Sequence, residues 1–259
     1  MKENEIILGD AYELIKEVPS ASIDCVYTDV PYDMSMGGGG KFLGNRQYVK
    51  EIMSRELDKG VRPELWDEVD RVLRKNNLFV WCSKDQIPYL LNRYVVEKGW
   101  NFVILCWCKK NPTPFTRQTW LADVEYCLHL YKGITLNDGI KNKSRWYVSS
   151  TNTYDKKKFD HPTIKPVELV ERHLLHATQP NEIVLDPFMG SGTTALACKH
   201  TGRKWLGFEI DEKFHQIAVD RLQGWDAHGG MSLLDSEPTE NEQITLFDID
   251  NKEEENHGE

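Results

Sequence analysis

An acidic side chain, a proline and an aromatic ring follow an apolar run in the segment Asp24-Cys25-Val26-Tyr27-Thr28-Asp29-Val30-Pro31-Tyr32-Asp33. Asp29 can accept hydrogen bonds from an amine, and the ring of Tyr32 can stack on a planar group. Pro31 stiffens the turn because its ring fixes φ. These residues predict a ligand site at the end of a strand, although a strand-end turn with a buried tyrosine explains the same pattern.

A second group of residues suited to ligand binding lies later in the chain. The apolar run Ile183–Leu185 is followed by Asp186, and Gly190 and Gly192 form a Gly-x-Gly turn before a helix-like stretch. Glycines let a ligand approach the backbone, and the start of a helix offers N–H groups. Glu209 ends the next apolar run, at a spacing that suits a carboxylate bound to ribose hydroxyls. The combination predicts a nucleoside-type cofactor, and the lack of a third glycine in the turn argues against NAD.

Short apolar runs alternate with helix-like stretches along the chain. The runs typical of buried strands are Ile23–Thr28, Leu78–Cys82, Phe102–Cys108, Tyr126–Tyr131, Ile183–Leu185 and Trp205–Ile210. The predicted helices are Arg62–Arg74, Pro166–Thr178, Thr193–Thr201 and Glu212–Gln223. This alternation predicts an α/β fold with a doubly wound, mostly parallel sheet and helices on both faces. In such a sheet, ligands bind at the carboxyl ends of the strands, where Asp29 and Asp186 are expected.

The net charge of the chain is −9 at pH 7, which by itself argues against a nucleic-acid partner. The charge is unevenly distributed, however. Residues 226–259 contain eleven acidic residues and one lysine, a net of −10, which leaves +1 for residues 1–225. We therefore expect a folded domain over 1–225 and an acidic, disordered tail over 226–259. Basic residues gather in two segments, 34–62 and 133–165, with net charges of +3 and +4.

The chain has six cysteines: Cys25, Cys82, Cys106, Cys108, Cys127 and Cys198. None forms a C-x-x-C pair, which predicts reduced core residues and no metal site. No apolar stretch reaches the roughly 18 residues that a membrane-spanning helix needs, and the first five residues resemble no secretory signal. We therefore expect a cytoplasmic protein that does not cross a membrane.

The two loops together resemble those of the beta class of S-adenosylmethionine-dependent DNA amino-methyltransferases, the N-4/N-6 DNA methylases. That family carries a (D/N/S)-P-P-(Y/F) catalytic loop followed by an F-x-G-x-G cofactor loop. The matching residues are Asp29-Val30-Pro31-Tyr32 and Phe188-Met189-Gly190-Ser191-Gly192. The segment His161-Pro162-Thr163-Ile164-Lys165-Pro166 resembles the family's H-P-T-x-K-P segment, and Gly9-Asp10 resembles its adenine-contacting acid. The resemblance covers residues 6–223 and departs at Val30, which replaces the first proline.

The resemblance implies a Rossmann-like methyltransferase fold and methyl transfer from S-adenosylmethionine to N6 of adenine in DNA, after the base has been flipped out of the duplex. Asp29 and the carbonyl of Val30 would accept hydrogen bonds from the target amine. Pro31 would stiffen the loop, and Tyr32 would stack on the base. An aspartate at the head of the loop favours adenine. The alternatives are cytosine-N4 methylation, an RNA or protein amine as acceptor, and a catalytically silent DNA-binding or clamp-associated module.

The resemblance also implies a set of cofactor-binding residues. They are Asp10, Thr163, Lys165, Asp186, Pro187, Phe188, Gly190, Gly192 and Glu209. Glu209 would bind the ribose hydroxyls, Asp10 the adenine amine, and Asp186 with the two glycines the methionine moiety. Lys165 could equally be a solvated lysine.

Double-stranded DNA is the expected partner, bound by residues of the two basic segments. The candidates are Lys41, Arg46, Lys141, Lys143, Arg145, Trp146, Lys156, Lys157 and Lys158. Residues 133–160 would form the target-recognition segment, whose short length favours a short recognition site or a homodimer. The tail segment Gln243-Ile244-Thr245-Leu246-Phe247 resembles the peptide by which bacterial replication proteins dock on the sliding clamp, although it could also pack on its own domain. The expected setting is restriction–modification, bacterial or phage-encoded.

Overall fold

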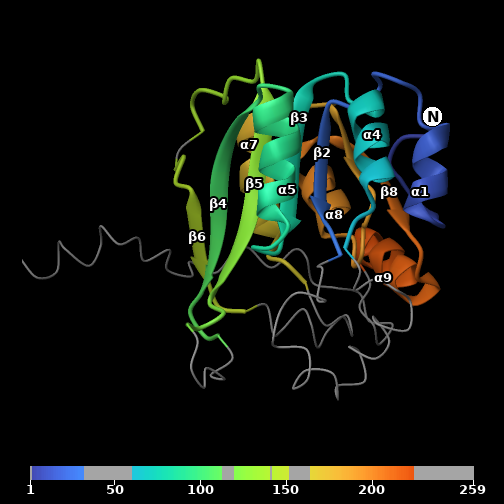
Figure 1. The fold of residues 1–259 in the computed structure, drawn as a ribbon. Coiled ribbons are helices and arrows are strands. Elements are labelled where there is room, and N and C mark those ends of the chain that lie inside the picture. Colours follow the sequence, from blue (N-terminus) through green and yellow to red (C-terminus); the bar gives the residue numbers. More distant parts are fainter. Residues whose placement is uncertain (1, 32–59, 113–119, 141, 152–163, 225–259) are drawn as a thin grey trace, which may run out of the picture.

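The computed structural model describes residues 2–31, 60–112, 120–140, 142–151 and 164–224. Within them an eight-stranded sheet is packed between two layers of helices (Figure 1). The strand order is β1-β8-β7-β2-β3-β5-β4-β6. Neighbouring strands are parallel except around β5, which runs antiparallel to both β3 and β4. The predicted α/β fold with a mostly parallel sheet is confirmed.

The predicted elements are all present, with ends that agree to within about two residues. The strands are β1 (Glu5–Leu8), β2 (Cys25–Asp29), β3 (Asn76–Cys82), β4 (Asn101–Lys109), β5 (Val124–Lys132), β6 (Trp146–Ser149), β7 (Ile183–Asp186) and β8 (Lys204–Glu209). The helices are α1 (Ala11–Leu14), α4 (Pro63–Val72), α5 (Ile87–Leu91), α7 (Val167–Ala177), α8 (Thr193–Thr201) and α9 (Glu212–Gln223), with short helical turns η1 (Ile15–Glu17) and η2 (Asn92–Glu97). Sequence reasoning did not predict β1, β6, α1 or α5.

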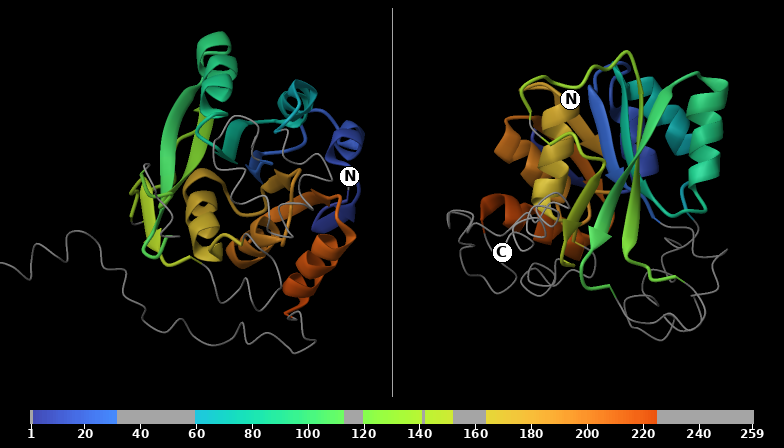
Figure 2. Two further views of the ribbon diagram at one scale, coloured as in Figure 1. Left: turned by 60° about the horizontal axis from the view of Figure 1, so that its bottom comes forward. Right: turned by 90° about the vertical axis from the view of Figure 1, so that its left-hand side faces the viewer.

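The two helical layers bury opposite faces of the sheet, as the right-hand view of Figure 2 shows. On one face, Val26 and Val80 pack with Val69 of α4 in a core that α1 and α5 also join. On the other face, Tyr27 and Trp81 pack against α7 and α8. Successive residues of β2 and β3 therefore point to opposite layers, as strand geometry requires. Because both faces are covered, these central strands are apolar throughout.

The six cysteines are free thiols, and four of them, Cys25, Cys82, Cys127 and Cys198, are buried. The other two, Cys106 and Cys108 on β4, are half-buried. In the described part of the chain, no group of three His, Cys, Asp or Glu side chains could hold a metal ion. No described helix has the length and hydropathy needed to cross a membrane.

Candidate active site

Four carboxylates lie at one edge of the sheet, at the ends of four neighbouring strands. Asp10 follows β1, Glu209 ends β8, Asp186 ends β7 and Asp29 ends β2. These strands are parallel, so their carboxyl ends meet at the same edge. The structure therefore brings together the four acids that the sequence predicted.

The side chain of Asp186 is buried beneath residues 187–192, the glycine loop that follows β7. Its Oδ1 accepts a hydrogen bond from the N–H of Phe188 (3.1 Å), and its Oδ2 accepts one from the hydroxyl of Thr194 (2.6 Å). Burial raises the pKa of Asp186 to about 7, although both hydrogen bonds favour the charged form. Asp186 thus connects the start of the loop to the first turn of α8. Its contact with a methionine moiety stays a prediction.

Glu209 connects the end of β8 to the glycine loop and to the turn after β1. Its Oε2 accepts a hydrogen bond from the N–H of Gly190 (2.7 Å), and its backbone carbonyl accepts one from the N–H of Gly9 (2.8 Å). The next residue, Asp10, caps the start of α1 with its carboxylate. Two carboxylates on adjacent strands supply the acceptors that the hydroxyl and amine groups of adenosine require. The chemistry of these side chains therefore fits the predicted cofactor.

Helix α9 packs against the glycine loop and donates hydrogen bonds to it. Gly192 has a φ of +81°, and a Cβ at this position would lie 2.9 Å from the Cβ of Ala218 on α9. The buried Arg221, also on α9, donates hydrogen bonds to the carbonyl (2.6 Å) and hydroxyl (3.0 Å) of Ser191 and to the hydroxyl of Thr193 (3.2 Å). Sequence reasoning missed Arg221. The sequence does contain one indication of its burial: Arg221 lies three residues after Ala218, and therefore on the same buried face of the helix.

The loop predicted to be catalytic begins at Asp29 and continues through Val30 and Pro31; we refer to it as the catalytic loop. The Val30 side chain is 3% exposed and belongs to the core under α4 and α5, and its N–H donates to the carbonyl of Trp81 (3.2 Å). The carbonyl of Pro31 accepts a hydrogen bond from the side-chain amide of Gln86 (2.9 Å). Burial of Val30 therefore anchors the loop where the family has its first proline. Gln86 was not predicted, because no motif in the sequence marks it.

Lys165 lies two residues before α7, and its side chain, 9% exposed, reaches the catalytic loop. Its Nζ forms an ion pair with Oδ2 of Asp29 and a second with Oε2 of Glu125 (3.2 Å). Glu125, near the start of β5, pairs through Oε1 with Nζ of Lys109 (2.6 Å). We refer to Lys109, Glu125, Lys165 and Asp29 as the charge chain. Lys165 is therefore not a solvated lysine, and its contact with a cofactor stays a prediction.

The two central members of the charge chain stabilise each other's charge. Burial opposes the charged form of Glu125, but the attraction of Lys165 and Lys109 outweighs burial and lowers the pKa of Glu125 to about 2. Burial also opposes the charge of Lys165, yet Asp29 and Glu125 raise the pKa of Lys165 above its ordinary value. The Nζ of Lys165 lies 4.8 Å from the ring centre of Trp81, a cation–π contact. Lys165 and Glu125 both remain charged at neutral pH.

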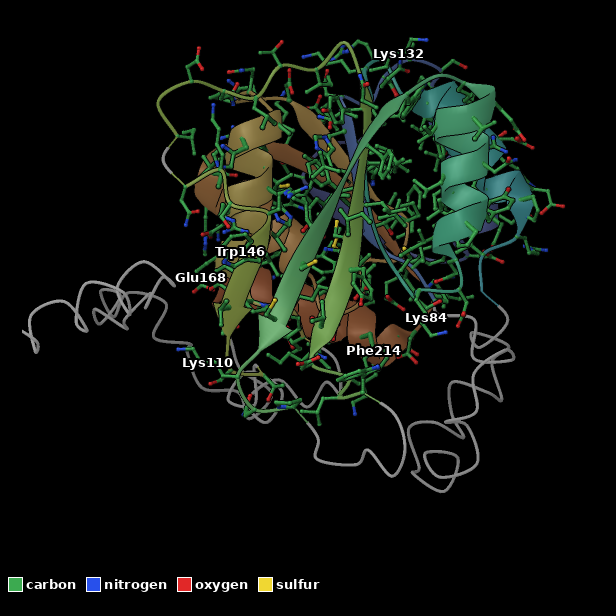
Figure 3. All side chains as sticks on the ribbon, turned by 60° about the vertical axis from the view of Figure 1, so that its left-hand side comes forward. Lys84, Lys110, Lys132, Trp146, Glu168 and Phe214 are labelled. Atoms are coloured by element: carbon green, nitrogen blue, oxygen red, sulfur yellow. The ribbon has the colours of Figure 1, made fainter. Side chains whose placement is uncertain are left out.

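Three of the predicted DNA-binding residues, Lys143, Arg145 and Trp146, fall within the described part of the chain. They lie on or just before β6, the outermost strand on one side of the described sheet. Trp146 begins β6 and is 46% exposed; Figure 3 labels it. Lys143 and Arg145 precede β6, in a segment that hydrogen-bonds His176 near the end of α7. Helix α7 begins beside the charge chain and runs away from it. This segment therefore lies toward the end of the sheet opposite the four carboxylates. The role of these three residues in DNA binding stays a prediction.

Part of the predicted site falls outside the described residues. This part comprises Tyr32, Lys41, Arg46, Lys141, Lys156, Lys157, Lys158, Thr163, the segment Gln243–Phe247 and the whole of 226–259. The described residues on either side of 152–163 both lie at the edge that holds the four carboxylates. On one side, the N–H of Thr151 donates a hydrogen bond to Oδ1 of Asn111 (2.6 Å), just beyond β4, and on the other side lies Lys165.

The comparison with protein families decides the classification of the chain. A family model described as DNA methylase, covering the N6 and N4 methylases, matches residues 23–220. The chain belongs to this DNA methylase family. It is 30% identical over 249 residues to the type II methyltransferase M2.LlaDCHI of Lactococcus lactis subsp. cremoris, covering 88% of this chain and 93% of the relative. It is 29% identical over 243 residues to M2.DpnII of Streptococcus pneumoniae, covering 85% and 91%.

Solved structures agree with this classification of the DNA methylase. The crystal structure of the M1.HpyAVI–SAM complex is similar with a TM-score of 0.64 and 28% identity, covering 84% of this chain and 98% of that chain. The cytosine-N4-specific PvuII DNA methyltransferase shares the fold, with a TM-score of 0.63 at 19% identity, covering 85% and 86%. The predicted N-4/N-6 DNA methylase family and its fold are therefore confirmed. The M1.HpyAVI–SAM complex agrees with S-adenosylmethionine as the predicted cofactor.

Proposed function

We propose that this DNA methylase transfers a methyl group from S-adenosylmethionine to the N6 amino group of adenine in double-stranded DNA. The observation that carries the proposal is the position of Asp29 at the end of β2, at the same edge as Asp186, Glu209 and Asp10. An acceptor for an amine thus lies at the edge that fits a nucleoside. The aspartate at the head of the loop favours adenine, because the family's cytosine-N4 enzymes usually carry serine there.

The residues that would hold the cofactor come from β1, β8 and the glycine loop. When bound, S-adenosylmethionine supplies the methyl group and keeps the electron pair of the broken carbon–sulfur bond. Glu209 would accept hydrogen bonds from the ribose hydroxyls, and Asp10 from the adenine amine. Because Glu209 also bonds the N–H of Gly190, ribose binding is linked to the shape of the glycine loop. Arg221 holds this loop from the side of α9.

The exocyclic amine of adenine is a weak nucleophile because its lone pair is delocalised into the ring. The Asp29 carboxylate and the Val30 carbonyl would accept hydrogen bonds from its two hydrogens and so favour a tetrahedral nitrogen with an available lone pair. The nitrogen loses one proton as it gains the methyl group, and Asp29 is the acceptor for that proton. The remainder of the rate enhancement would come from holding the reacting atoms in line.

The target adenine has to leave the duplex, because base pairing hides its N6. Flipping a base costs about a few kcal/mol. Tyr32, which lies outside the described residues, would stack on the flipped base and return roughly 1–3 kcal/mol of this cost. The basic residues of 34–62 and 133–165 would bind the phosphate backbone.

We also propose that residues 1–225 form the catalytic domain of a cytoplasmic protein in a restriction–modification system.

The proposal is tested by incubating the protein with unmethylated DNA and tritiated S-adenosylmethionine, followed by analysis of the methylated nucleoside. The wild-type protein should form N6-methyladenine. Asp29→Ala should lower the rate by about 100-fold or more, because it removes an acceptor of the target amine. Calorimetry should find its affinity for S-adenosylmethionine unchanged. Asp85→Ala is the control, since Asp85 pairs with Lys84 (2.8 Å) just beyond β3 and contacts no member of the charge chain.

Each other result of this experiment selects a different function. N4-methylcytosine as the product would replace adenine by cytosine as the target. Methylated RNA or protein, with unmethylated DNA, would change the class of acceptor. A wild-type protein that binds DNA and transfers no methyl group would be a silent DNA-binding module. A near-wild-type rate for Asp29→Ala would contradict the role of this residue.

We further propose that residues 226–259 form an acidic tail and that Gln243–Phe247 within it binds the bacterial sliding clamp. The support is its resemblance to the clamp-binding peptide of replication proteins. A pull-down with purified clamp should recover the wild-type chain and fail with the double substitution Leu246→Ala/Phe247→Ala. Equal recovery of both chains would end the idea.

We also propose that two copies of the chain associate through an apolar face of β4 and β6 that is exposed among the described residues. Phe102 and Ile104 of β4 and Val148 of β6 are 37–43% exposed, and the register of β4 and β6 places them on one face. An exposed apolar face of this kind is typical of a protein interface. Sedimentation analysis should find a dimer for the wild type and a monomer for Ile104→Asp, and a wild-type monomer would refute the proposal.

A further inference from the structure

We propose that Lys165 is the positioning residue of Asp29 and holds the carboxylate in place to receive the target amine. This inference rests on the proposed function, because it assigns a role relative to Asp29. Its basis is the double ion pair of one ammonium group, which contacts Oδ2 of Asp29 and lies 3.2 Å from Oε2 of Glu125. Asp29 and Lys165 are 136 residues apart, so the contact is made by the fold and not by the local chain.

The backbone on both sides of Lys165 is fixed by packing. Ile164 is 1% exposed and packs with Ile217 of α9, and Pro166 caps the start of α7. The Lys165 ammonium also lies over the ring of Trp81, the residue paired with Asp29 between β2 and β3. A lysine held at its backbone and its ammonium group has few orientations left. The carboxylate that it contacts is restricted with it.

Glu125 gives Lys165 a second anchor within the site. A buried ammonium with one partner would follow any movement of Asp29, whereas a second carboxylate on another strand keeps it in place. Lys109 at the end of β4 balances the charge of Glu125 (2.6 Å), so the charge chain holds two positive and two negative groups. This arrangement depends on β5 being antiparallel to its neighbours, because only a reversed strand begins at the edge where the parallel strands end.

The groups around Asp29 give Lys165 an electrostatic role as well as a geometric one. Among the described residues, titratable groups that interact with Asp29 include Lys165, Asp186 of β7, Tyr27 of β2, Cys82 of β3 and Cys127 of β5. Glu125 and Lys109 lie one and two contacts further away. Of the groups named, Lys165 is the cation in contact with Asp29, and Asp186 when ionised repels it. Without the ammonium, the carboxyl group of Asp29 would therefore hold its proton to higher pH.

The test measures single-turnover methyl transfer to unmethylated DNA by the full-length chain between about pH 5 and pH 9. Lys165→Met removes the charge at nearly constant side-chain length. We expect its rate at neutral pH to fall about 30-fold, and the acidic limb of its rate profile to move to higher pH. Lys165→Arg, which keeps the charge, should restore at least about a tenth of the wild-type rate and the wild-type profile. Lys165→Gln serves as a second neutral variant if Lys165→Met unfolds.

Two controls separate positioning of Asp29 from a general structural role. Lys98→Met is the matched lysine control, because Lys98 pairs with Asp70 and lies 5.3 Å from the ring centre of Tyr94, but precedes β4 at the opposite edge of the sheet. It should leave the rate profile unchanged. In an Asp29→Asn background, Lys165→Met should lower the residual rate by no more than about twofold, because its partner has already lost its charge.

Several results would overturn the inference and leave the proposed function intact. One is a wild-type rate and profile for Lys165→Met together with an inactive Asp29→Ala. Another is a rate loss for Lys165→Met with an unchanged pH profile and the same size in the Asp29→Asn background, which a purely structural role would give. An active Asp29→Ala, in contrast, would overturn the proposed function itself.

Discussion

Gly192→Ala should lower the free energy of unfolding by about 2–5 kcal/mol. Gly192 has a φ of +81°, where an L-residue costs roughly 1–2 kcal/mol. The added Cβ would lie 2.9 Å from the Cβ and 3.0 Å from the Cα of Ala218. Both separations are shorter than van der Waals contact, and a helix backbone cannot rotate away as a long side chain can. Moving α9 aside costs about 1–3 kcal/mol more, the usual range for an overpacked core.

Urea unfolding, followed by circular dichroism, measures this loss directly. Gly202→Ala is the matched control, because Gly202 has a φ of +71° and a Cβ there would meet no atom within 4 Å. It should lose about 1–2 kcal/mol, the backbone cost alone. The difference between the two variants isolates the contact with α9. If Gly192→Ala loses no more than Gly202→Ala, the close packing of α9 on the glycine loop is refuted.

Two further predictions concern a buried histidine and a buried arginine. Burial lowers the pKa of His129 in the folded protein to about 3. The neutral side chain therefore makes its full contribution to the free energy of unfolding above about pH 6.5, the pKa of histidine in the unfolded chain, and this contribution is lost as the pH falls toward 3. Between pH 7 and 5 the wild type should lose about 2 kcal/mol more unfolding free energy than His129→Gln, which lacks this group; equal changes in the two proteins would contradict the assignment. Arg221→Met should weaken S-adenosylmethionine binding about tenfold in calorimetry, because the loop at Ser191 loses its charged donor. Arg71→Met, which also loses hydrogen bonds to backbone carbonyls but far from the loop, should bind normally.

The strands were predictable because buried strands leave continuous apolar runs, but the direction of β5 was not. The run Tyr126–Tyr131 has the same composition whichever way it is read, so the sequence did not indicate that β5 opposes its neighbours. β6 was not predicted because its four residues lie at the edge of the sheet within a basic segment. Its alternation of exposed and half-buried residues is too short to count as a period.

The acids at the strand ends were predictable, whereas the contacts between distant side chains were not. Asp29, Asp186 and Glu209 each follow a buried strand, and parallel pairing alone is enough to bring them to one edge. Nothing near Lys165 in the sequence indicates Asp29 or Glu125 as its partners, since these contacts depend on how three elements pack. The same holds for Arg221, whose hydrogen bonds reach back to a loop 30 residues earlier.

The pairing of β1 with β8 sets the order in which the site can be completed during synthesis. β1 is made long before β8 and lies at the edge of the described sheet, where its partner is β8, with Glu5 opposite Leu206 and Leu8 opposite Glu209. Contacts between residues so far apart in the sequence form late in folding. Asp10 therefore takes its position beside Glu209 only after β8 has been made. A chain that stops before β8 therefore lacks this pair of acids, the two side chains proposed to bind adenosine.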